Sequence, residues 1–215
     1  MSAEYIEVES RAELSPEQRA RVLGFMATLG EITQINRVMV DYGSQNGETV
    51  VVRINNGIQE VVTKQGDVAA AARMARDENP TTALEQTLAD LAAKGRTRAM
   101  ISWRYLFVAA AEGSEGSFGI EYSLRDVFDP EGHYHTTLLE AEALGVRSGQ
   151  EQTARAQTDR AILAFDLQLL EGTAWKAWIH RIHHTVDQEF TYTEATAQQL
   201  VQTIGHMTAT APQVG

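Results

Sequence analysis

Apolar and charged side chains alternate with a period of two along the first residues of the chain. Ile6 and Val8 fall on one side of a predicted strand, whereas Glu7, Glu9 and Arg11 fall on the other. Like charges on one face of a strand repel each other, so the pattern calls for a reason. Exposure to solvent is the simple one, because surface strands tolerate charge. The alternative is a polar interior: a barrel whose lumen holds metal ions and an anion.

The same alternation returns later in the chain. Glu140 and Glu142 occupy alternate positions of another predicted strand, and Glu121 shares a face with Ser123 and Arg125 in the strand before it. Three more predicted strands each carry an isolated basic residue: Arg53, Lys64 and Arg104. The recurrence favours a shared polar interior over a set of unrelated solvent faces.

The remaining elements follow from periodicity and boundary signals. Ser15, Pro16 and Gln18 are typical of a helix start, and Gly30 of its end. Asn56-Gly57 predicts a tight hairpin that lets Arg53 and Lys64 face the same space. Further strands are predicted at 35–42, 49–55, 58–64, 98–109, 117–128 and 133–142, and further helices at 67–76, 82–94, 150–170, 175–187 and 194–206.

This pattern predicts an α+β protein. We expect an antiparallel β-barrel, or tunnel, with helices packed outside and a helical C-terminal extension. The tunnel domain is expected over residues 1–146, the helical extension over 147–207 and a disordered tail over 208–215.

Composition narrows the class of protein. The net charge is −11, from 18 basic and 29 acidic residues, which argues against nucleic acid or an anionic membrane as partner. Cysteine is absent, which excludes disulfides and thiolate metal sites. The sequence has no apolar run long enough for a membrane helix and no signal-peptide pattern, so a cytoplasmic location is expected. A homodimer is left open.

The charged strand residues suggest a specific chemistry. The carboxylates of Glu7, Glu9, Glu121, Glu140 and Glu142 are hard oxygen ligands that suit Mg²⁺ or Mn²⁺. The basic groups of Arg11, Arg53, Lys64, Arg104 and Arg125 are donors for phosphate. Metal on one side and guanidinium on the other is the arrangement that phosphoryl transfer needs.

In order along the chain, these motifs resemble the CYTH domains, or triphosphate tunnel metalloenzymes. That family opens with Glu-x-Glu-x-Lys, continues with single Arg and Lys residues on successive strands, and closes with a Glu-x-Glu strand. The resemblance, from Ile6 to Glu142, implies an enzyme that hydrolyses a small triphosphate: inorganic triphosphate, thiamine triphosphate or a nucleoside triphosphate. It also implies catalytic roles for Glu7, Glu9 and Arg11.

Departures from the family pattern leave alternatives open. Arg11 stands where Lys is usual, Asn55 replaces the second Arg of Arg-x-Arg, and Gly66 follows Lys64 where a second Lys is common. The alternatives are an adenylyl cyclase of the same family and a non-catalytic module that binds polyphosphate or nucleotide. His180, His183 and His184 share one helix side, but no His-Glu-x-x-His arrangement accompanies them, so packing or solvent exposure is expected there.

Overall fold

The computed structural model describes residues 4–30, 32–45, 48–55, 58–65, 72–78, 97–109, 117–129, 131–185 and 188–190, with positions 193, 195, 199, 202 and 206. Over 4–5, 34–45, 48–55, 58–65, 72–78, 97–101, 103, 183–185 and 188–190 it describes the backbone and not the side chains. The predicted helix at 82–94 and the tail at 208–215 lie outside these residues, as does most of the predicted last helix.

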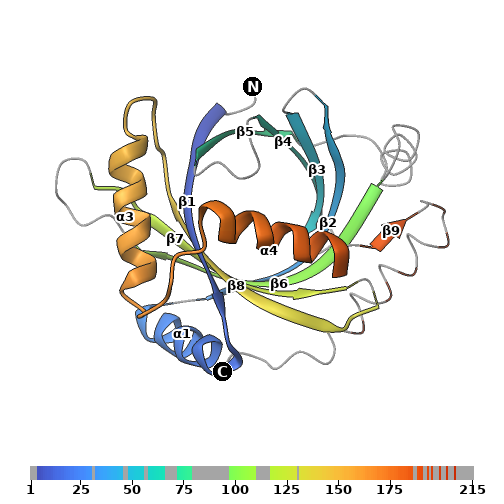
Figure 1. The fold of residues 1–215 in the computed structure, drawn as a ribbon, viewed down its shortest axis with the longest axis horizontal. Coiled ribbons are helices and arrows are strands. Elements are labelled where there is room, and N and C mark those ends of the chain that lie inside the picture. The colour runs from blue at the N-terminus through green and yellow to red at the C-terminus, as the bar shows by residue number, and fades with distance from the viewer. Residues whose placement is uncertain are drawn as a thin grey trace.

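Within the described residues, nine antiparallel strands form one sheet. They are β1 (Glu4–Leu14), β2 (Thr33–Gln45), β3 (Glu48–Asn55), β4 (Ile58–Gln65), β5 (Ala72–Glu78), β6 (Thr97–Ala109), β7 (Ile120–Phe128), β8 (Tyr134–Ala143) and β9 (Gln188–Phe190). Their order is β2-β3-β4-β5-β1-β8-β7-β6-β9, and β2 also pairs with β6. The pairings of β1 to β8 therefore run in an unbroken circle, which Figure 1 shows as a ring of strands.

Two helices pack against the outside of this ring. They are α1 (Pro16–Leu29) and α3 (Glu151–Leu163). The predicted start of α1 is confirmed, because the Ser15 side chain accepts from the Gln18 backbone and the Gln18 side chain accepts from the Ser15 backbone. The α+β class, with an antiparallel sheet and helices on its outer face, is thus confirmed.

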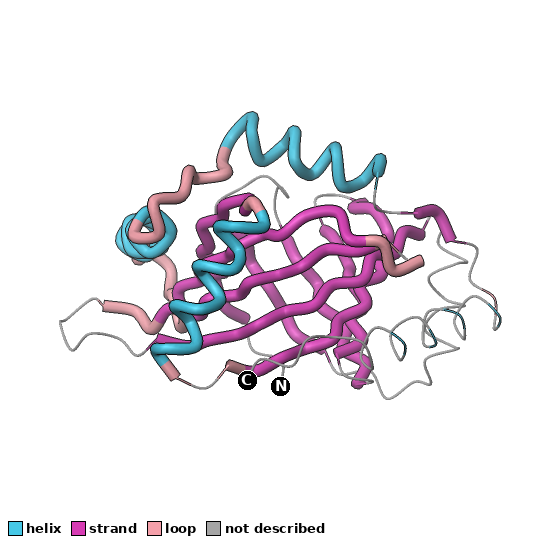
Figure 2. Tube along the Cα trace, turned by 90° about the horizontal axis from the view of Figure 1, so that it is seen from below, coloured by secondary structure: helices cyan, strands magenta, loops and turns pink. Residues whose placement is uncertain are grey.

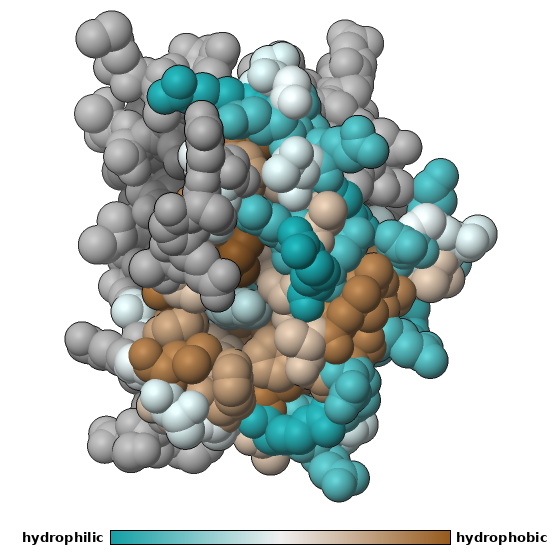
Figure 3. Space-filling view, turned by 90° about the vertical axis from the view of Figure 1, so that its left-hand side faces the viewer, coloured by the Kyte–Doolittle hydropathy of each residue, from teal (hydrophilic) through white to brown (hydrophobic). Residues whose placement is uncertain are grey.

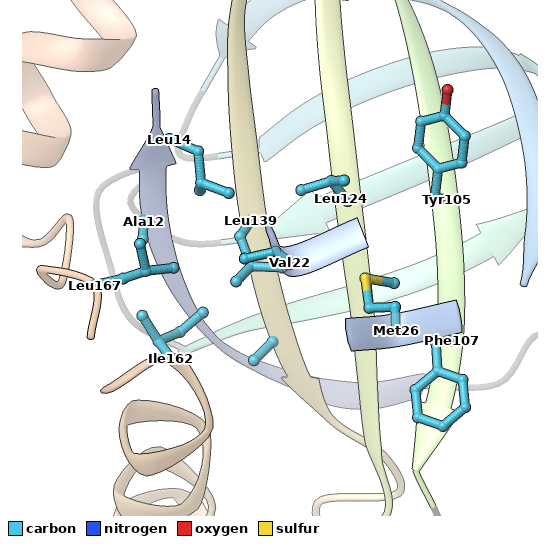
Figure 4. Close-up of a cluster of buried hydrophobic side chains, with 11 residues drawn as sticks. Ala12, Leu14, Val22, Met26, Tyr105, Phe107, Leu124, Leu139, Ile162 and Leu167 are labelled. Carbon is cyan, nitrogen blue, oxygen red and sulfur yellow. The ribbon is translucent and has the colours of Figure 1, made fainter. Parts of the chain in front are cut away.

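The main apolar core lies between these helices and the outer face of the strands. Val22 and Met26 of α1 and Ile162 of α3 meet Leu124 of β7 and Leu139 of β8, and all five are fully buried (Figure 4). Leu124 and Leu139 are also paired across the β7–β8 ladder. This core sets the parity of both strands, because the side chains next to these leucines must point into the ring.

Helix α4 (Gly172–Thr185), also among the described residues, lies at one end of the ring. It crosses the ring of strands in Figure 1 and lies above the strands in Figure 2. Trp175, Trp178 and Ile182 pack there against Val127 and Leu138, which alternate with the outward-facing core residues of their strands. The helix therefore covers apolar positions of the inner face at this end.

Two sequence expectations are wrong in detail. Residues 72–76 belong to β5 and not to a helix, because the backbone of this stretch pairs with both β1 and β4. The helix expected over 150–170 ends at Leu163, and Asp166 then takes a positive φ of 55°. The alanine-rich pattern favoured helix at 72–76, but pairing with two neighbouring strands makes this stretch a strand. The amphipathic pattern favoured helix beyond Leu163, but the chain turns there.

The outer surface is mixed in character. Figure 3 looks onto the side that carries α1 and α3, where hydrophobic patches interrupt a hydrophilic surface. Phe25, Leu29 and Leu163 contribute exposed apolar side chains. Among the helices in the described part of the chain, none is both long and apolar enough to cross a membrane.

Candidate functional site

Three charged residues of β1 are buried. Glu7, Glu9 and Arg11 are only 7%, 8% and 8% exposed, and Val8, Ser10 and Ala12 are buried on the opposite face. Solvent exposure therefore does not explain the alternation at the N-terminus. Since burial of a charge is costly without a partner, these three side chains need compensating groups nearby.

Helix α3 holds the back of β1 through polar contacts. The Ser10 hydroxyl lies 2.6 Å from the Thr158 hydroxyl and donates to Asp159 Oδ1 at 2.6 Å. Arg155 donates to the backbone carbonyl of Glu9 at 3.1 Å and pairs with Asp159 at 2.8 Å. These contacts fix the strand from outside the ring, so its charged face is held inward.

Three of the carboxylates expected to bind metal come together. Glu7, Glu9 and Glu142 each offer an oxygen, and these oxygens all lie within 4.8 Å of one another. The strand register explains this proximity, since Glu9 is directly opposite Glu142 in the β1–β8 ladder. Glu121 is opposite Glu142 on the other side but is not in this group. Crowded carboxylates favour a bound cation.

Glu140 has a different environment from the other carboxylates. Its Oε2 accepts from Arg104 Nη2 at 3.0 Å. Its Oε1 lies 3.5 Å from Arg125 Nη2 and 3.6 Å from Arg11 Nε. One buried carboxylate thus faces three guanidinium groups, and Arg104 is further oriented by donating to Ser123 at 2.8 Å.

Arg11 links the carboxylate group to the arginine group. Its guanidinium pairs with Glu9, and its Cζ lies 4.3 Å from the ring centroid of Trp175 on α4. Burial lowers the pKa of Arg11, while Glu140 and Glu7 act in the opposite direction. Because an arginine pKa begins far above neutrality, the group stays charged.

Arg53 and Lys64 were expected to bind substrate, and only their backbone is described. The ladder pairs position 64 with Ala75, position 75 with Tyr5 and position 53 with Glu60. Positions 53 and 64 are therefore in phase with Glu7, Glu9 and Arg11 around the ring. Gly66 lies outside the described residues, and Asn55 is the last residue of β3.

Two residues of this site were not singled out from the sequence. They are Arg155, which lies on a helical pattern typical of a solvated surface, and Trp175 of α4. The Arg155–Asp159 spacing of four was a weak local signal. His180 is exposed on α4, and the side chains of His183 and His184 lie outside the described residues.

Comparisons with known proteins concern the fold. The chain is similar to the PH1819 protein from Pyrococcus horikoshii OT3, with a TM-score of 0.57, 14% identity and coverage of 81% of this chain and 99% of that chain. It is also similar to a conserved hypothetical protein from Pyrococcus furiosus, with a TM-score of 0.55 and 12% identity. That match covers 75% of this chain and 91% of the other. The Mimivirus capping enzyme triphosphatase has a lower TM-score of 0.46 and 11% identity. That match covers 76% of this chain and 89% of the other.

No protein-family model matches the sequence. No curated protein matches it either. At identities of 12% and 14%, the likeness to the two Pyrococcus proteins extends to the fold alone, and the chain shares that fold. The resemblance to the CYTH domains rests on the sequence motifs described above.

Proposed function

We propose that this protein hydrolyses a small triphosphate with the help of a divalent metal ion, inside a tunnel formed by β1 to β8. One observation carries the proposal. A group of three carboxylates adjoins a group of three guanidinium groups on the inner face of neighbouring strands. Metal ligands beside phosphate ligands are what phosphoryl transfer requires.

The carboxylate group fits a hard cation. Glu7, Glu9 and Glu142 provide oxygen ligands at mutual distances that one ion can bridge. The donor set contains neither sulfur nor nitrogen, so Mg²⁺ or Mn²⁺ suits it better than Zn²⁺. We propose these three residues as the metal ligands, with Glu121 next to them at the β7–β8 pairing.

The arginine group fits phosphate oxygens. Arg11, Arg104 and Arg125 surround one carboxylate, which leaves an excess of positive charge on this side of the site. The buried Nε of Arg11 has no hydrogen-bond partner among the described residues, and its 3.6 Å separation from Glu140 is too long for a hydrogen bond. An anionic oxygen would supply the missing acceptor.

More cations are needed for a polyanion. The basic residues at positions 53 and 64 are in phase with this site in the strand register, so we propose that they bind the remaining phosphate oxygens. Arginine offers a bidentate fork and lysine a point charge, and both act on phosphate.

The residues then have distinct roles in hydrolysis. A bound divalent ion would supply Lewis-acid stabilisation and activate a water molecule. Glu7, Glu9 and Glu142 would fix the ion's position, and Arg11, Arg104 and Arg125 would orient the phosphate chain and stabilise charge on its oxygens. Trp175 and its neighbours on α4 would keep bulk water from this end of the site.

A substrate panel tests the proposal. Purified protein is incubated with Mg²⁺ or Mn²⁺ and inorganic triphosphate, thiamine triphosphate or ATP, and phosphate release is measured. We expect metal-dependent release that Glu9→Gln reduces by at least tenfold, with partial recovery at high metal concentration. Glu17→Gln, an exposed carboxylate change on α1, is the matched control and should retain activity.

Other results would redirect the interpretation. Formation of a cyclic nucleotide from ATP would favour a cyclase. Tight triphosphate binding without turnover across the panel would favour a binding module. Metal-independent phosphate release that survives Glu9→Gln would contradict the proposed site.

A further inference from the structure

A second group of metal-ligand side chains lies far from the triphosphate site. Asp129 follows β7, and Glu131 and His133 precede β8; their ligand atoms lie within 4.8 Å of one another. His135 adds a further ring nitrogen, since its Nε2 lies 3.1 Å from Asp129 Oδ2. His135 and Glu142 are seven residues apart on β8, roughly 23 Å along the strand, so the two groups are separate.

A β-bulge lies at His135. Val127 is opposite Thr136, whereas Phe128 is opposite Tyr134, so His135 has no partner across the ladder. His133 and His135 are two residues apart, the spacing that places side chains of an extended chain on the same side. Both lie near one carboxylate oxygen of Asp129.

The carboxylate of Asp129 is held in place for two imidazoles. The residue is only 6% exposed, and its Oδ1 accepts from the backbone N–H groups of Glu131 at 3.0 Å and His133 at 2.9 Å. Its Oδ2 lies 3.0 Å from His133 Nδ1 and 3.1 Å from His135 Nε2. One oxygen is thus occupied by the backbone, and the other faces two nitrogen donors.

These separations suit a transition metal. Ligands about 2.1 Å from a tetrahedral zinc ion are about 3.4 Å apart, so the 3.0 and 3.1 Å separations at Asp129 Oδ2 need to widen by only about 0.4 Å to hold the ion. Imidazole nitrogen with carboxylate oxygen is a borderline donor set that prefers Zn²⁺ and its neighbours over Mg²⁺. The backbone hydrogen bonds to Oδ1 are of the kind that orient a ligating carboxylate.

Burial raises the pKa of Asp129, but hydrogen bonds from the His133 backbone and from the two imidazoles outweigh this, so the pKa lies below its usual value. The accessible side of the site is provided by His133, whose side chain is 75% exposed.

We propose that Asp129, His133 and His135, with Glu131 as a further oxygen ligand, form a binding site for a divalent transition metal such as Zn²⁺. The ion would replace the protons shared between the imidazoles and the carboxylate. It would join the end of β7 to the start of β8 and so stabilise this connection. The proposal is independent of the triphosphate site.

Calorimetric titration with Zn²⁺ tests the site. The buffer contains excess Mg²⁺, which occupies the separate carboxylate group of Glu7, Glu9 and Glu142. We expect one zinc ion per chain, with affinity reduced at least tenfold in His133→Gln and in His135→Gln. His180→Gln, which removes an exposed imidazole on α4, should bind zinc as the wild type does. Added zinc should also raise the melting temperature of the wild type and not of His135→Gln.

Three results would overturn the proposal. The first is absence of zinc binding by the wild type. The second is an unchanged zinc affinity in both His133→Gln and His135→Gln, and the third is loss of zinc binding in His180→Gln. Asp129→Asn is less informative, because its Oδ1 also holds the backbone of the connection. The two histidine variants leave those backbone contacts in place, so a folding defect does not obscure the answer.

Discussion

Replacing Glu140 by Gln separates the two roles that this residue could have. The sequence pattern pairs it with Glu142 as a metal ligand, whereas the structure surrounds it with Arg11, Arg104 and Arg125. If Glu140 neutralises arginines, Glu140→Gln leaves those buried charges poorly compensated. The protein should lose stability and keep its metal affinity.

The distances give the magnitude. At 3.0–3.6 Å and an effective dielectric constant of about 20, each contact has a gross attraction of about 5 kcal/mol before desolvation is counted. Most of that attraction is offset by the cost of burying the charges. Breaking a buried ion pair at one partner costs about 3–5 kcal/mol in measured cases, and we expect a free-energy loss in that range.

Urea denaturation in the presence of a chelator measures this loss. Inorganic triphosphate should restore more stability to Glu140→Gln than to the wild type, because the anion replaces the missing negative charge. Mn²⁺ titration provides the contrast: Glu7→Gln should weaken binding at least tenfold, and Glu140→Gln should not. A Glu140→Gln protein that keeps its stability and loses Mn²⁺ would show that Glu140 is a metal ligand and refute the reasoning.

Three further predictions concern individual side-chain contacts. Arg19→Gln should cost roughly 3 kcal/mol in urea denaturation, because it leaves the buried Asp126 carboxylate with only weaker partners. Arg181→Gln should cost less than about 1 kcal/mol at neutral pH, because its pair with Glu13 is partly exposed. Burial raises the pKa of Glu13, but hydrogen bonds from Arg181 and Thr136 lower it by more, so the net pKa is below its usual value. The stability difference between wild type and Arg181→Gln should therefore be present above about pH 4 and vanish as the pH falls through the lowered pKa. Trp175→Leu should cost about 3 kcal/mol and raise the KM for triphosphate, because the Arg11 guanidinium loses the ring it stacks on.

Matched variants check these expectations. Arg21→Gln alters an exposed arginine on the same helix as Arg19 and should change stability by less than about 0.5 kcal/mol. Trp178→Leu disrupts the same stacked pair, whose centroids are 5.0 Å apart, without removing the ring beside Arg11. Equal KM values for Trp175→Leu and Trp178→Leu would contradict a positioning role for Trp175. A stability difference for Arg181→Gln that persists at pH 2 would contradict the assignment to Glu13.

Local sequence pattern was sufficient for much of the architecture. Alternation of period two identified the strands around Glu7, Arg104, Arg125 and Glu140, because side-chain direction in a strand depends only on parity. The boundary signals at Ser15 placed the start of α1, since a capping box is satisfied by residues three apart. These features need no knowledge of distant contacts.

Strand pairing decided what parity left open. Alanine-rich residues 72–76 have high helix propensity, but they form β5 because two neighbouring strands provide hydrogen-bond partners. The register also divided the carboxylates, which look equivalent in sequence. Glu142 is opposite Glu9 and joins the candidate metal group, whereas Glu140 is opposite Arg11 and meets three arginines.

The chain by itself therefore determined most of the strands, which of their residues are charged and which share a face. Only the tertiary structure decided which of them meet. The arginines around Glu140 come from three strands, the ring beside Arg11 comes from α4, and the hydrogen-bond donor to the Glu9 carbonyl comes from α3. Such contacts join residues up to about 160 positions apart, and no local periodicity encodes them.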